Sequence, residues 1–199
     1  MPSRWHGRLG LIFIGMLSAQ AALSSEMDWP CVQRRVAELS VAQMWAGPPV
    51  DPATSHWRDD QDIAALARSL ASRRTSLVEA SIAIERLGNA SGQEKETKLT
   101  LLFAGVFDLI NSERRRIING IERYARKQRS LADQISEASR NLKQDSKTAT
   151  ERTALEQKLQ WDTRIYDDRN QALTYVCESP VLLEQRVYAL AQEISRHLN

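Results

Sequence analysis

The chain has 199 residues, of which 42% are hydrophobic and 6% aromatic, and it contains few glycines and prolines, a composition typical of one helical domain with its own core. Two of its 27 basic residues lie in the first 21 positions, which hold no acidic residue, so the remainder carries 25 charges of each sign. This balance excludes the strong net positive charge of nucleic-acid-binding proteins, and we predict no nucleic acid partner.

Residues 1–21 have the pattern of a secretory signal peptide. Arg4 and Arg8 precede an uncharged apolar stretch over residues 9–17, and Ala19 and Ala21 supply small residues where signal peptidase cleaves. The stretch is roughly half of the ~20 residues that a membrane-spanning helix needs, so cleavage is favoured over a retained N-terminal anchor. We therefore predict an exported chain with no transmembrane segment after removal of the signal.

The chain has two cysteines, Cys31 and Cys177. Export brings a protein into an oxidising compartment, where an isolated pair of cysteines is expected to form a disulfide. Their wide separation fits neither a CxxC redox pair nor a CxxCH haem attachment. We predict a structural disulfide, which the chain-entropy model credits with about 5 kcal/mol as an upper figure.

Residues 22–58 are predicted to form an extended strap that contains one short helix within residues 36–45. Three tryptophans stand there among turn-forming prolines and a glycine, and we expect their rings to anchor the strap on the rest of the protein: Trp29, Trp45 and Trp57. Residues 59–199 are predicted to form the helical bundle and coiled-coil domain. Its first helix is predicted over residues 60–87, because acidic residues crowd the start and Gly88 and Gly92 follow the end.

A second helix is predicted over residues 93–144, where an apolar seam continues for roughly five heptads, which is typical of coiled-coil packing. The seam consists of Phe103, Phe107, Ile110, Ile117, Ile121, Tyr124, Leu131, Ile135, Ala138 and Leu142, with Arg114 and Gln128 as its two polar positions. A helix of this length would be a rod of about 78 Å. Its densest apolar part, residues 99–110, is predicted to be the most buried part of the bundle.

Two further helices are predicted over residues 149–178 and 181–197, with Pro180 separating them in the first turn of the last helix. A turn near Asp145 would make the second and third helices antiparallel and place Gln128 opposite Asp162. The fold class that follows is all-α, an elongated helical bundle with a long antiparallel coiled-coil hairpin and one disulfide. Any part of the seam left exposed would favour a homodimer.

No catalytic or cofactor-binding motif is present, and we predict neither a catalytic residue nor a cofactor. The histidines that remain after the signal are His56 in a loop and His197, one turn after Glu193. A single such pair does not make the metal-binding motif of a helical bundle, and we predict no metal site. Carboxylates at positions 162, 167 and 168 are expected to lie on a solvated helix face.

Four basic side chains on the second long helix form the candidate interaction surface: Arg123, Arg126, Lys127 and Arg129. They could bind an acidic partner helix, lipopolysaccharide or anionic lipid head groups. The alternative, which we favour, is that they form ion pairs with Asp162, Asp167 and Asp168 on the next helix.

The segment Asp28-Trp29-Pro30-Cys31-Val32-Gln33 and the later segment Met44-Trp45-Ala46-Gly47-Pro48 resemble the start of small exported helical proteins of proteobacteria. Residues 102–107 and 120–125 are similar to the same group. The resemblance implies a periplasmic location, and no function follows from it.

We therefore predict a non-enzymatic periplasmic interaction or scaffold protein with a protein partner in the cell envelope. The alternative is a helical bundle that binds a small ligand or a metal and assists an envelope enzyme or transport system.

Overall fold

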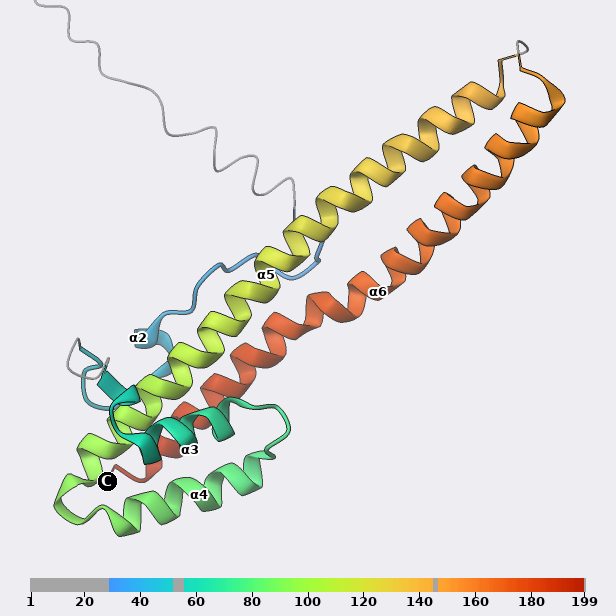
Figure 1. Ribbon diagram of the computed structural model, residues 1–199. Helices are drawn as coiled ribbons and strands as arrows, with labels where there is room; N and C mark the ends of the chain where they lie inside the picture. The colour runs from blue at the N-terminus through green and yellow to red at the C-terminus, as the bar shows by residue number, and fades with distance from the viewer. Residues whose placement is uncertain (1–28, 52–55, 145–146, 199) are drawn as a thin grey trace, which may run out of the picture.

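The computed structural model describes residues 29–51, 56–144 and 147–198, and all regular secondary structure in these ranges is helical (Figure 1). The predicted signal peptide lies outside the described residues. The helices are α2 (Val41–Met44), α3 (Gln61–Ala71), α4 (Leu77–Ala90), α5 (Lys95–Leu142) and α6 (Ala149–Arg196), with the 3-10 helix η2 (Gly92–Glu94) before α5. The all-α prediction is confirmed, and the long second helix is present as α5.

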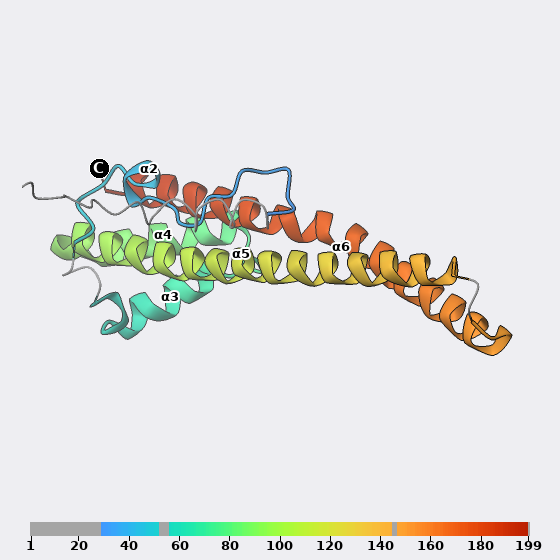
Figure 2. The same ribbon diagram turned by 90° about the horizontal axis from the view of Figure 1, so that it is seen from above.

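The molecule has two parts that share the helices α5 and α6, each 48 residues long. At one part, which we call the bundle end, α3, α4 and the strap pack around the first half of α5 and the second half of α6 (Figure 1). The other halves of the two helices continue alone as an antiparallel stalk. Seen from above, α5 is nearly straight and α6 crosses it, while the strap and α3 lie on opposite sides of the pair (Figure 2).

The core of the bundle end forms where the sequence is most densely apolar. Leu99, Leu102, Phe103 and Val106 are fully buried, which confirms the prediction for residues 99–110. The indole of Trp45 stacks on Phe103 with ring centroids 4.1 Å apart, so the strap closes the core on this side.

Trp57 is likewise buried, and it packs closely against Gly105 of α5. A Cβ atom at Gly105 would lie 2.9 Å from the Trp57 ring and equally close to Ala67, so only glycine lets these elements approach. Two of the three predicted tryptophan anchors are therefore buried, and Trp29 is half-buried.

The predicted interruption at Pro180 is wrong, because α6 continues through this residue without a break. Proline removes one helical hydrogen bond and strains the preceding turn, which costs about 3 kcal/mol in an unsupported helix. Here Pro180 is buried, and Leu173, Cys177, Leu183 and Val187 continue the buried face on both sides of it. Tertiary packing thus holds the helix together where local propensity would end it.

The predicted helix over residues 60–87 is in fact two helices, α3 and α4, with a turn over residues 72–76. Ser76 and Glu79 form a capping box that begins α4, which stops α3 from continuing. The guanidinium of Arg186 in α6 donates hydrogen bonds to the carbonyls of Leu70 and Thr75 and holds the two sides of the turn.

The predicted pairing of Gln128 with Asp162 is wrong by one helical turn. Gln128 Nε2 donates a hydrogen bond to the carbonyl of Tyr166 at 3.1 Å, and Tyr124 donates to the carbonyl of Arg169 at 3.0 Å. An apolar seam with steps of three and four residues almost matches itself after a shift of four. The seams therefore specified the antiparallel contact without specifying its register.

Candidate functional site

The strap is attached to α5 and α6 at the level where the bundle end becomes the stalk. The predicted disulfide is present, with Cys31 and Cys177 joined by an S–S bond and their Cα atoms 5.6 Å apart. Cys177 packs with Ile121 and Leu173, and Trp29 packs against the same cluster. We call this level, marked by the disulfide, the waist of the molecule.

Polar contacts continue the attachment along α5 toward the bundle end. Glu122 pairs with Arg35 at 2.5 Å, and Asn111 Oδ1 accepts a hydrogen bond from the Leu39 backbone at 3.1 Å.

Arg114, a polar seam position, is 3% exposed and donates to the carbonyls of Val36 and Pro180. Burial lowers the pKa of Arg114, and the charge of Glu184 partly opposes that change. Arg114 therefore serves as a structural link between strap, α5 and α6.

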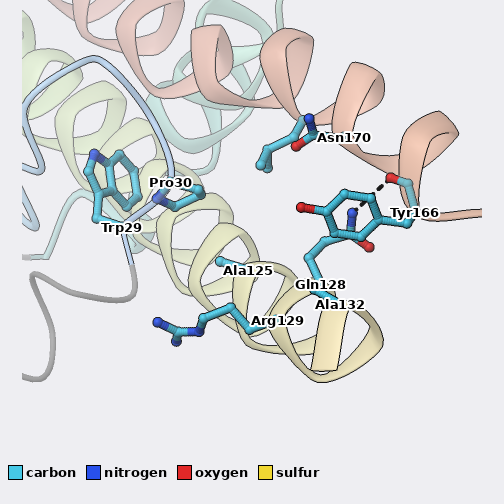
Figure 3. Close-up of a pocket in the computed structure, with 9 residues that line it drawn as sticks. Trp29, Pro30, Ala125, Gln128, Arg129, Ala132, Tyr166 and Asn170 are labelled. Carbon is cyan, nitrogen blue, oxygen red and sulfur yellow. Dashed lines mark hydrogen bonds between the residues drawn. The ribbon is translucent and has the colours of Figure 1, made fainter. Parts of the chain in front are cut away.

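A cavity of about 190 Å³ opens at the waist on the strap side (Figure 3). Its walls include the Trp29 ring, Tyr166, Asn170 and the guanidinium-bearing Arg129. Gln128 projects from α5 between them and, although only 7% exposed, has a side-chain oxygen with no hydrogen-bond partner. This oxygen is itself buried from solvent, and an unpaired buried acceptor costs roughly 1–3 kcal/mol.

The opposite flank of the waist carries an apolar groove of about 270 Å³ with almost no polar lining. Side chains of α5 form one wall, among them Ile117 and Tyr124, and Ala172 and Val176 of α6 form the other. Val176 is 43% exposed in this groove, whereas the neighbouring Cys177 is buried.

Ala172 also belongs to a second row of residues that runs along the outside of α6. We call this row the outer stripe, and its members follow one another at alternating steps of four and three residues: Trp161, Ile165, Asp168, Ala172, Tyr175, Ser179 and Leu182. Four of them are large hydrophobic side chains with high exposure, at 64% for Trp161, 38% for Ile165, 75% for Tyr175 and 47% for Leu182. This spacing is that of a helix surface packed against another helix, yet no part of the described chain covers it.

The four basic residues of the predicted interaction surface are all exposed on α5. Arg129 lines the cavity on the strap side. Asp162, one of the predicted partners of these residues, is instead paired with Lys158 on its own helix. The expected ion pair between Asp162 and the basic residues of α5 is therefore not formed.

The two histidines in the described ranges form local pairs. His56 contacts Asp59 at 3.4 Å, and His197 contacts Glu193 at the same distance. A hydrogen bond from Ser81 is the main reason that the pKa of Glu193 is lowered, with His197 and Arg196 adding to it. Within the described ranges no three metal-ligating side chains converge, and no helix has the length and apolarity needed to cross a lipid bilayer.

In comparison with known proteins, the chain matches no family model, no curated protein and no solved structure. Functional inference therefore depends on the geometry of the molecule itself. The outer stripe was not predicted from the sequence, although its heptad spacing could have revealed it.

Proposed function

We propose that this chain is a non-enzymatic interaction protein of the periplasm, and that the outer stripe of α6 is its contact surface. One observation carries the proposal: a heptad-spaced row of exposed large hydrophobic side chains on a helix that is already packed on its other face. Burial of apolar surface is the main driving force of association, and large exposed apolar patches on a protein mark sites of interaction. The intramolecular disulfide and the predicted signal peptide support action outside the cytoplasm.

The architecture suits this task. The bundle end and the disulfide hold the base of α6, so the stripe is presented on a rigid rod rather than on a loop. Because α6 is already a rigid helix, it loses little conformational entropy when a partner binds to it.

Cross-linking in cells tests the proposal. A photo-reactive amino acid at Ile165 should give a discrete covalent adduct, whereas one at Asp167, exposed on another face of α6, should not. Trp161→Ala should weaken the Ile165 adduct, since the neighbouring indole supplies contact area. If position 165 gives no more adduct than position 167, the stripe is not a contact surface.

The cavity beside Trp29 favours a second candidate function, the binding of a small molecule. Its ligand would present a flat apolar face to the rings of Trp29 and Tyr166. Occupation of the cavity would be measured as a rise in melting temperature.

A further inference from the structure

We propose that the partner at the outer stripe is a second copy of this chain, with the two α6 helices antiparallel and the two Ala172 residues at the centre of the contact. The inference rests on the proposed function, because it names the occupant of the same surface. The stripe from Trp161 to Leu182 is about 33 Å long at 1.5 Å per residue and covers three heptads, the length at which a helical seam becomes specific.

The stripe is close to symmetric about Ala172. Ile165 and Ser179 each lie seven residues from it, and the two other pairs of positions are equidistant to within one residue, so one stripe can pack on its own copy after a two-fold rotation. The facing pairs would be Trp161 with Leu182, Ile165 with Ser179, and Asp168 with Tyr175. Each large aliphatic or aromatic side chain then faces a smaller or complementary one, and the Tyr175 hydroxyl can donate to the Asp168 carboxylate. Alanine at the centre permits close approach of the two backbones.

The charges beside the stripe are complementary in the same arrangement. Arg164, Gln171 and Glu178 repeat every seven residues and form an exposed row that borders the stripe, and Arg164 and Trp161 line the same small cavity. Neither Arg164 nor Glu178 forms an ion pair within the described ranges. In the antiparallel pair, Arg164 of each copy faces Glu178 of the other, and the two Gln171 residues face each other.

A parallel pair would be unfavourable by comparison. It would place Asp168 beside Asp168, Arg164 at the level of Arg164, and Glu178 at the level of Glu178 of the second copy. Like charges at facing positions oppose association, so the charge pattern favours the antiparallel orientation.

The strap does not compete for this surface. Its first described residue, Trp29, lies in the cavity with Tyr166 and Asn170, on the other flank of α6 from Ala172 and Val176. The second copy therefore binds with the disulfide and the strap in place.

Sedimentation of the purified, disulfide-bonded chain over a wide range of concentrations tests the proposal. We expect a monomer–dimer equilibrium that Ile165→Glu weakens about tenfold or more, because a charge replaces an apolar side chain in the contact. Tyr188→Glu is the matched control, since Tyr188 is similarly exposed at 51% on α6 but lies outside the spacing of the stripe. It should leave the dimer unchanged, and both variants should keep the helical content of the parent.

Exchange of charges tests the orientation. Arg164→Glu and Glu178→Arg should each weaken self-association, because the altered residue then meets a like charge. An equimolar mixture of the two variants should associate as well as the parent chain, since both facing pairs are again opposite in sign. No gain on mixing would overturn the antiparallel assignment.

The outcomes separate this inference from the proposed function. A purified chain that stays monomeric at every concentration overturns the second copy as partner. If the cross-linker at position 165 still captures a different protein, the contact surface stands with another occupant. If the chain is monomeric and position 165 gives no adduct, both proposals fail.

Discussion

The bundle end and the stalk use the same two helices but bury them to different extents. Around Phe103 and Ile110, α5 is covered by α3, α6 and the strap, and these side chains are at most 1% exposed. Further along, Leu131 and Ile135 are half-buried between two helices, and Trp161 is largely in water. Two helices can cover only the row of side chains between them, whereas a bundle of three or four covers several rows. Stability is thus concentrated at the bundle end, and the stalk leaves more apolar surface in water.

The disulfide at the waist should show the largest effect. Replacement of Cys31 and Cys177 by serine should lower the free energy of unfolding by about 5 kcal/mol as an upper figure, because the unfolded chain regains the freedom of a loop of 146 residues. Urea denaturation of the oxidised parent and the double variant measures the difference. An unchanged midpoint would mean that the bundle end alone determines stability and that the waist contributes nothing.

Alanine substitutions of buried side chains in the two regions should show the next largest effects. Phe103→Ala should cost about 3–5 kcal/mol, since it opens a cavity under Trp45 in a closed core. Leu131→Ala in the half-buried stalk should cost less, about 1–2 kcal/mol, because water already reaches the site and neighbouring side chains can relax. Chemical denaturation measures both. Equal costs would contradict the contrast between a closed bundle and an open stalk.

The smallest effect concerns two capping boxes of the same type, Ser76 with Glu79 at the bundle end and Thr148 with Glu151 at the stalk tip. Replacing either cap residue by alanine should cost about 1 kcal/mol of helix stability. At Ser76 the loss should appear in global unfolding, because α4 packs on the core. At Thr148 it should appear as faster amide exchange in the first turns of α6, since the tip can open locally. Global destabilisation by Thr148→Ala would show that the stalk unfolds together with the bundle.

The same capping boxes show that a local sequence pattern can predict where a helix starts. A serine or threonine followed three residues later by glutamate is a known helix start. The pattern of Ser76 and Glu79 predicts a helix start at residue 77, which divides residues 60–87 into α3 and α4. The cavity at Gln128 could not have been found in this way, because it depends on Trp29 and Asn170, which lie far from Gln128 in the chain.

The sequence by itself determined the helical class, the length of α5, the buried run before Ile110 and the disulfide, because each depends on spacing or residue type along one segment. Only the tertiary structure decided the continuity of α6 through Pro180 and the register of α5 on α6. Both depend on contacts between distant residues, such as Arg114 with the Pro180 carbonyl and Gln128 with the Tyr166 carbonyl. A repeating seam allows several registers, and the side chains that choose among them meet only when the chain has folded.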